Sequence, residues 1–390
     1  MNEILFRLNR LQKISFAVGI LFLILCGFGV AIAPQKFFIS WLWSFIFWIG
    51  LTLGCFNAAM IHYLTGGRWG SSTRRFFEAG FMTLPLMGIF FIPVLFGLHF
   101  LYPWARPNEV SGDKILQQKI IYENFPAFLA RAIFFFGIWI LIATRLRKWS
   151  LQQDLMSDVS PTIKMRTLSG PGIVIVPLTI TFAFVDWIMS IEPAWFSTIF
   201  GVILLAGEIL IAVAFVILLL AWFRPFPPLA EIANEKQFHD LGNLLLAFVM
   251  FWTYVAFSQF LIIYSGNQPH EIGWYLRRIC GNWKFLAGAV VAFHFFVPFC
   301  VLLFCAAKKN IRRLAIIAAL LFVAHILEIF WTIAPTFYRD GISIHWTDFA
   351  AWLGIGGMWL GVFAGNLKCH PLLARNDPQI ENSIAKTANA

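Results

Sequence analysis

Long apolar stretches separated by short polar ones dominate this chain of 390 residues. Ten of them reach the length of about 20 residues that a helix needs to cross a bilayer core of roughly 30 Å. They run approximately over 14–33, 38–63, 77–101, 125–144, 172–191, 196–222, 241–264, 283–307, 314–334 and 346–367. Because a backbone in lipid must satisfy its own hydrogen bonds, each stretch is predicted to form a helix. The pattern therefore predicts an all-α polytopic membrane protein.

The first stretch resembles a signal peptide, since it follows Arg7, Arg10 and Lys13 and ends in a run of small and apolar residues at 31–33. Its length of about 20 apolar residues is long for the hydrophobic region of a signal peptide. Pro34 would also directly follow the cleaved bond. We therefore expect this stretch to be retained as the first transmembrane helix.

Composition supports a membrane protein, because only 12% of the residues are charged, against about 25% in soluble domains. The net charge of +10 does not indicate a nucleic-acid partner, since Lys and Arg lie between the apolar stretches and form no basic face. The six cysteines show no Cys-x-x-Cys spacing. No iron–sulfur cluster, metal site or covalently bound cofactor is expected, so a partner would have to carry electrons in any redox reaction.

The distribution of basic residues predicts the orientation in the membrane. Of the Lys and Arg residues, 20 fall on the side of the N-terminus and 8 on the other side, with Arg131 inside a stretch. The positive-inside rule then places both termini in the cytoplasm, which agrees with an even number of spans. On that side, the connection 145–169 is expected to be a polar, basic loop, and the tail after Pro371 to be short and polar.

Four ionisable residues are predicted to lie near the middle of the membrane: Glu208, His294, His325 and Glu328. Their depth follows from a rise of about 1.5 Å per residue, and the i, i+3 spacing puts His325 and Glu328 on one helix face. Charges at that depth are costly unless they pair or face water, which makes these residues functional candidates. They can form a proton relay, or a neutral hydrogen-bonded core that fixes helix packing.

A second group lies nearer the outer side and comprises His99, Arg131 and Asp186. Arg131 and Asp186 can form a structural ion pair. Alternatively, His99 and Asp186 can line a pocket for a quinone headgroup, whose oxygens need a hydrogen-bond donor and a proton acceptor.

Further candidates for a proton path lie on the seventh stretch and at its cytoplasmic end. Each has a side chain that can exchange a proton or hold a water molecule, although those at the end can also be solvated helix termini. They are His239, Asp240, Tyr254 and Ser258. Two histidines at mid-depth could also ligate a haem. The chain, however, lacks the histidine pairs on single helices that dihaem bundles use.

With these residues in view, the sequence resembles a known family. Residues 186–198 read Asp-Trp-Ile-Met-Ser-Ile-Glu-Pro-Ala-Trp-Phe-Ser-Thr, and the stretches 239–243, 251–260 and 294–299 follow in the same order as in that family, as do Trp331 and Pro335. They resemble the F subunit of bacterial alternative complex III, a quinol:cytochrome c oxidoreductase, within the NrfD or polysulfide-reductase-like group of membrane subunits. The resemblance covers about 77–335.

The resemblance implies two four-helix bundles flanked by two peripheral helices. The expected divisions are 1–37 for the first peripheral helix, 38–192 and 193–335 for the two bundles, and 336–390 for the last helix and the tail.

The resemblance also implies a subunit of the bacterial inner membrane that carries no redox centre of its own. Its partners would be a sister quinone-binding membrane subunit, an iron–sulfur subunit and c-type cytochromes. The sister subunit would perform most of the quinol oxidation, which leaves this chain a proton path or part of a quinone site. The residues carried over as candidates are Asp186, His239, Asp240, Tyr254, Ser258 and His294. The alternative function is a stand-alone secondary transporter with a substrate site at mid-depth.

Overall fold

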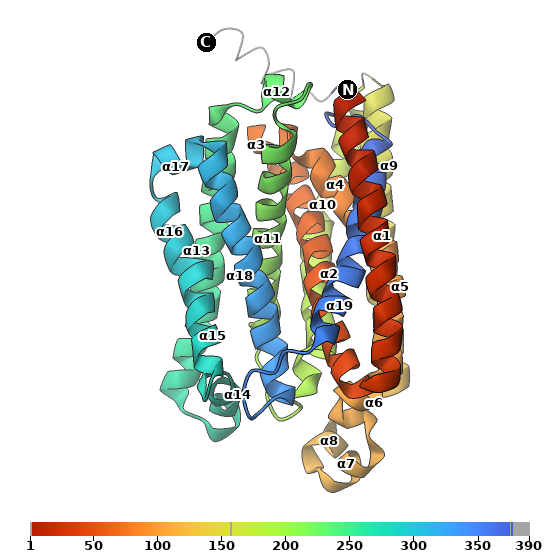
Figure 1. Cartoon of the computed structure of the whole chain (residues 1–390), viewed down its shortest axis with the longest axis vertical. Coiled ribbons are helices and arrows are strands. Elements are labelled where there is room, and N and C mark those ends of the chain that lie inside the picture. Colours follow the sequence, from red (N-terminus) through yellow and green to blue (C-terminus); the bar gives the residue numbers. More distant parts are fainter. Residues whose placement is uncertain (1, 157, 375, 377–390) are drawn as a thin grey trace.

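The computed structural model describes residues 2–156, 158–374 and 376, which fold into an elongated bundle of helices with no strand among them (Figure 1). Ten helical segments of the described residues are long and apolar enough to cross a membrane. The predicted class, an all-α polytopic membrane protein with ten spans, is confirmed. Residues 375 and 377–390, which make up most of the predicted polar tail, lie outside the described residues.

Seven of the ten spans are single helices, and the third and eighth are broken. The helices of the first five spans are α1 (Asn2–Ile32), α2 (Pro34–Thr65), α4 (Arg74–Phe81) with α5 (Leu84–Phe96), α9 (Phe125–Leu155) and α10 (Ser160–Trp187), the last extended by the 3-10 turn η2 (Met189–Ile191). Those of the other five are α11 (Phe200–Phe223), α13 (Glu235–Gly266), α15 (Trp283–Val290) with the π-helix η3 (Val291–Phe296) and α16 (Val297–Leu302), α18 (Ile311–Phe337) and α19 (Trp346–Lys368).

Short helices lie at the two ends of the bundle. At the terminal end, where α1 begins and α19 finishes, are α3 (Arg68–Ser71), α12 (Leu229–Ile232) and α17 (Cys305–Lys309) (Figure 1). At the opposite end, called the hairpin end here after the turn between α10 and α11, are α6 (Leu98–Leu101), η1 (Pro103–Ala105), α7 (Pro107–Gly112), α8 (Lys114–Lys119) and α14 (Pro269–Ile279).

Asparagine begins three of the long helices. The side chains of Asn124, Asn234 and Asn310 accept hydrogen bonds from backbone N–H groups in the first turns of α9, α13 and α18. These N–H groups have no partner within a helix, so an Asn at this position fixes where the helix starts.

Helix α2 lies at the centre of the bundle, and 94% of the residues in its most apolar stretch are buried. It contacts α4, α5, α10, α11, α18 and α19.

Two indole hydrogen bonds join α2 to α19. The indole of Trp48 donates to the carbonyl of Trp352 at 3.0 Å, and that of Trp359 donates to the hydroxyl of Thr52 at 2.8 Å. These bonds attach α19 to the central helix, so the last span packs against the core.

We divide eight of the spans into two groups of four, following their order in the chain. The first group comprises α2, α4 with α5, α9 and α10, and the second comprises α11, α13, α15 with η3 and α16, and α18. The two groups are in contact through α2, which packs against α11 and α18, and through α10, which packs against α11. Figure 1 shows the second group on the left and the first on the right, with α1 and α19 beside the first group. The division of the sequence into separate bundles at 37, 192 and 335 stays a prediction.

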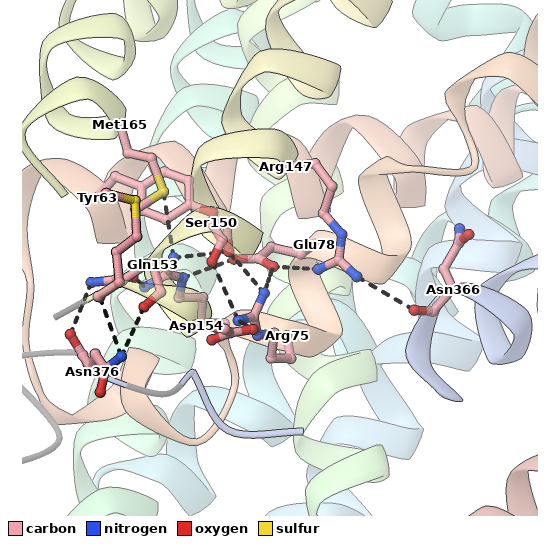
Figure 2. A network of polar contacts seen from close by, with 12 residues as sticks. Tyr63, Arg75, Glu78, Arg147, Ser150, Gln153, Asp154, Met165, Asn366 and Asn376 are labelled. Carbon is pink, nitrogen blue, oxygen red and sulfur yellow. Dashed lines mark hydrogen bonds and ion pairs between the residues drawn. The ribbon is translucent and has the colours of Figure 1, made fainter. Parts of the chain in front are cut away.

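The prediction that 145–169 is a polar loop is wrong, since α9 continues to Leu155 and α10 begins at Ser160. The reason is a network of buried polar side chains at the terminal end, drawn in Figure 2. Its centre is Glu78, which accepts hydrogen bonds from Arg74 and Arg75 at 2.8 Å and from Arg147 at 2.5 Å. The helical extension of α9 is what carries Arg147 to this carboxylate.

The network joins several elements, because Tyr63 on α2 and Ser150 on α9 also donate to Glu78, at 2.8 and 2.5 Å. Arg147 donates further to the backbone carbonyl of Asn366 on α19, at 3.4 Å. The three guanidinium groups and the carboxylate are buried together, and each of them has a partner of opposite charge inside the protein.

Close packing of α2 against α11 yields the first prediction. A Cβ added at Gly54 would lie 1.9 Å from the backbone oxygen of Glu208. We expect Gly54→Leu to push the two helices apart and to lower the free energy of unfolding by about 3 kcal/mol or more, as overpacking does in tight cores. Thermal unfolding of the purified chain in detergent measures this. Gly137→Ala is the control, since nothing lies within 4 Å of its added Cβ; equal loss in both variants would contradict the packing argument.

Candidate functional site

Three of the four residues predicted at mid-depth meet in the second group of helices. The Oε2 atom of Glu328 lies 2.8 Å from Nδ1 of His325 and 3.4 Å from Nε2 of His294. The two imidazole rings stack with their centroids 5.7 Å apart. All three side chains are buried. We call these residues the His–Glu cluster; one carboxylate oxygen stands between two imidazoles.

Local helix geometry explains how α18 contributes two members. His325 and Glu328 are the fifteenth and eighteenth of the 27 residues of α18, so they lie near the middle of the span. Their i, i+3 spacing places both side chains on one face, where they form the hydrogen bond between them.

His294 reaches the cluster from a π-helix. The six residues of η3 interrupt the eighth span, and His294 is the fully buried one among them, whereas Phe293 and Phe296 are exposed. A π turn rotates the side chains that follow it relative to a regular α-helix, and such turns are frequent at functional sites. The amino-acid sequence gave no signal for this turn.

Trp252 on α13 orients the carboxylate and was not among the predicted site residues. Its indole N–H donates to Oε1 of Glu328 at 2.7 Å, and its ring lies 4.1 Å from that of His294. Because Oε1 is engaged by the indole, Oε2 is left to face the two histidines. A tryptophan at mid-depth in an amphipathic span is a usable signal, since a buried indole N–H needs an acceptor.

Several nitrogens of the cluster have no hydrogen-bond partner among the described residues. They are Nδ1 and Nε2 of His294 and Nε2 of His325, and all three are buried. Buried polar atoms are normally paired, which makes each exception a position of interest. These nitrogens are the positions at which the cluster can bind a further polar group.

The donor atoms of the His–Glu cluster lie within 4.8 Å of one another, a spacing that a single metal ion could bridge. Two ligands on one tetrahedral zinc ion, with bonds of about 2.0 Å, are roughly 3.3 Å apart. The separation of 2.8 Å between His325 and Glu328 is shorter than that and matches a hydrogen bond. The geometry therefore favours a shared proton at this position.

Glu208 is close to the cluster but faces another helix. Its neighbour Gly207 faces the cluster, because a Cβ added at Gly207 would lie 2.9 Å from His325. Glu208 itself faces α2, because a Cβ added at Gly50 on that helix would lie 3.0 Å from Oε1 of Glu208. The carboxyl group therefore points to α2. Its Oε2 atom is buried and has no hydrogen-bond partner among the described residues. Glu208 thus adds a second acid next to the cluster, on the side of the first group of helices.

The outer group of predicted residues divides in the structure. Arg131 donates to both oxygens of Asp186, at 2.7 and 3.1 Å, and also lies over the ring of Tyr122. His99 is exposed and has an edge contact with Phe100. No hydrogen bond or ion pair joins His99 to Asp186 within the described part of the chain. The structure shows the ion pair of Arg131 with Asp186, and the quinone pocket stays a prediction.

The turn between α10 and α11 is held by a carboxylate that the sequence left without a partner. Glu192 accepts hydrogen bonds from Arg277 at 2.5 Å, from Arg278 at 3.0 Å and from the hydroxyl of Thr336. Burial lowers the pKa of Arg278 to about 10, against the effect of the Glu192 carboxylate, so the guanidinium stays charged at neutral pH. It also lies 3.7 Å from the ring of Trp274. The adjacent residues Arg277 and Arg278 in the connection before the eighth span were a sequence signal that a carboxylate at this end has a partner.

The remaining predicted path residues lie apart from the His–Glu cluster. Tyr254 is 70% exposed, because a position two residues beyond Trp252 is turned about 200° around the helix. Ser258 is half-buried. At the terminal end, Asp240 pairs with Arg68 at 3.2 Å, and His239 contacts Asn243 at 3.3 Å. No chain of hydrogen bonds within the described residues links these four to the cluster.

The two arginines at Glu192 form a matched pair of variants. Arg278 is buried and Arg277 is 41% exposed. We expect Arg278→Gln to cost about 3–5 kcal/mol, because it leaves a buried carboxylate without its main counter-charge, and Arg277→Gln to cost about 1 kcal/mol or less. Thermal unfolding of both variants measures the difference. Similar losses would show that burial does not decide the strength of this ion pair.

Comparison with known proteins adds no relative: no protein-family model matches the chain, and no curated protein matches it. The described residues form a helical fold with ten spans suited to a membrane, and a cluster of titratable groups is buried among these spans.

Proposed function

We propose that this chain is a multi-pass subunit of a respiratory quinol:cytochrome c oxidoreductase in the bacterial inner membrane, and that it relays protons across the middle of the bilayer. The observation that carries the proposal is the His–Glu cluster, in which His294, His325 and Glu328 approach one another from two spans at mid-depth. Ionisable groups are rare at that depth and are typical of proton pathways.

The chemistry of the relay follows from the shared oxygen. A neutral imidazole donates from one nitrogen and accepts at the other. His325 can therefore take up a proton at Nε2 and then release the one on Nδ1 to Oε2 of Glu328, which leaves the imidazole neutral again. The same oxygen can pass the proton to Nε2 of His294, 3.4 Å away. Small movements of His294 then decide whether the two halves of the path connect.

The alternative role of the cluster is a polar core that only fixes helix packing. Such a core is expected to use its hydrogen-bonding atoms fully. In the His–Glu cluster, Nδ1 of His294 and Nε2 of His325 have no hydrogen-bond partner among the described residues, and Nε2 of His294 lies 3.4 Å from Oε2 of Glu328. The unpaired nitrogens support proton transfer at mid-depth over a purely structural role.

The respiratory assignment rests on the motif at 186–198 and the segments that follow it. In that assignment an iron–sulfur subunit and c-type cytochromes carry the electrons, since this sequence has no cysteine pairs for a cluster. A sister membrane subunit would oxidise the quinol. The bidentate bond between Arg131 and Asp186 supports a structural role for that pair, because the carboxylate is already engaged. The termini would be cytoplasmic, following the basic residues.

Replacing the shared carboxylate tests the relay. Glu328→Gln retains the shape of the side chain but removes the group that accepts the proton. We expect proton translocation by the reconstituted complex to fall by roughly 10²-fold, as when a positioned acid–base group is lost, while quinol oxidation by uncoupled complex remains measurable. Simultaneous recording of proton release and cytochrome c reduction in proteoliposomes gives both rates.

Glu271→Gln serves as its control, because Glu271 lies in α14 at the hairpin end and is partly exposed there. This variant should have the proton-to-electron ratio of the unmodified complex. If Glu328→Gln also keeps that ratio, the cluster does not conduct protons and its role is architectural.

The respiratory assignment has a separate test. A tagged chain, extracted in mild detergent from its native membrane, is expected to co-purify with haem proteins whose visible spectrum is that of c-type cytochromes. A chain that purifies alone and binds a small solute would instead be a transporter.

A further inference from the structure

A basic pocket opens at the terminal end of the bundle, far along α13 and α18 from the His–Glu cluster. It has a volume of about 510 Å³, within the range of roughly 300–1,000 Å³ that is usual for small-molecule sites. It lies where α11 ends, α13 begins, and α17 is followed by α18. Its lining residues are Arg224, Glu235, Phe238, Ala306, Lys309, Asn310, Ile311 and Arg312.

The charges of the pocket are unbalanced. Arg224, Lys309 and Arg312 supply three cations against the single carboxylate of Glu235. The side-chain nitrogens of these three residues form no hydrogen bond or ion pair within the described part of the chain, and Arg224 lies 5.1 Å from the ring of Phe238. All three cations are exposed to solvent, and they exceed the carboxylates of the lining by two. The pocket therefore has a net positive charge, which favours an anion.

Helix α18 adds a further positive contribution. It is 27 residues long and begins beside the pocket, with the side chain of Asn310 accepting from the backbone N–H groups of Arg312 and Arg313. The N-terminal end of a long helix carries a partial positive charge and favours anions, phosphate among them. This field acts together with the three side-chain cations.

The depth of the pocket identifies the source of the anion. Arg224 directly follows the span that ends at Phe223, while Glu235 and Ile311 begin two other spans. The cations therefore lie at the boundary between hydrocarbon and headgroups. Next to them, Leu303 and Phe304 are exposed apolar side chains on the outer surface of the bundle. A ligand here can place a phosphate among the cations and acyl chains along that surface.

We propose that this pocket binds the phosphate group of an anionic phospholipid. Basic pockets between transmembrane helices are suited to such headgroups, because the lipid phosphate lies at the same depth as the cations. Ala306, Phe238 and Ile311 provide apolar walls for the glycerol backbone. The inference concerns residues that take no part in the proposed proton relay, so either proposal can fail without the other.

The test measures lipid retention by the full-length chain. The protein is reconstituted in nanodiscs of phosphatidylglycerol mixed with phosphatidylcholine, released into detergent, and examined by native mass spectrometry for bound lipid. We expect one phosphatidylglycerol to be retained. Arg312→Gln should weaken its retention by about tenfold, the loss expected for a hydrogen bond to a charged group. Arg224→Gln should have the same effect, because Arg224 lines the same pocket from the end of another helix. It provides a second test if Arg312→Gln does not fold.

Arg313→Gln is the matched control, because Arg313 is the next residue of α18 and does not line the pocket. It removes the same charge and should leave retention within about twofold, since salt screens charges that do not touch the ligand. Equal retention of phosphatidylglycerol and phosphatidylcholine, or equal loss in Arg312→Gln and Arg313→Gln, would overturn the proposal. Inorganic phosphate is the second arm: displacement of the lipid by millimolar phosphate would assign the site to a soluble anion instead.

Discussion

The structure depends on one constraint, namely that a charge buried among membrane helices must find its partner inside the protein. Three carboxylates meet it with guanidinium groups. Glu78 has Arg74, Arg75 and Arg147, and the other two pairs are Asp186 with Arg131 and Glu192 with Arg278. Arg74 and Arg75 lie on the same helix as Glu78, whereas Arg147, Arg131 and Arg278 reach their carboxylates from segments distant in the sequence. The latter pairs hold different segments together.

The His–Glu cluster meets the same constraint in a different way. Glu328 is held by an indole N–H and by imidazoles. These partners bind a carboxylate more weakly than guanidinium groups do, and the charge of an imidazole is reversible. A histidine can gain or lose its charge near neutral pH, whereas an arginine in a protein cannot. The permanent ion pairs lie towards the two ends of the bundle and the titratable group lies at its centre. In the proposed relay, the protonation of this central site changes while the ion pairs at the two ends stay formed.

Small residues make that arrangement possible. Gly50 and Gly54 on α2 face Glu208, and Gly207 faces His325, so backbones approach closely where polar side chains must be enclosed. Close approach through glycine is a usual way for membrane helices to associate, because lipid offers no hydrophobic drive between them. At the central contact of α2 and α11 the same glycines exclude lipid from the neighbourhood of the acids.

The basic pocket is the counterpart of these closed sites at the membrane surface. There three cations share one protein carboxylate, that of Glu235, and the bilayer can offer further anions. Internal carboxylates therefore satisfy the charges in the interior, and lipid phosphates would satisfy those at the boundary.

The sequence by itself determined the ten spans and the helical class, because the length of an apolar stretch and the hydrogen bonding of the backbone are local properties. It also determined that His325 and Glu328 share a face near mid-depth, since both lie on one regular helix. Only the tertiary structure decided that His294 joins them through a π turn, that Trp252 orients the carboxylate, and that α9 extends to bring Arg147 to Glu78. It also turned Tyr254 away from the cluster. The physical reason is that the rotation of each helix about its axis, and the neighbours it meets, are set by side-chain packing between segments distant in the chain.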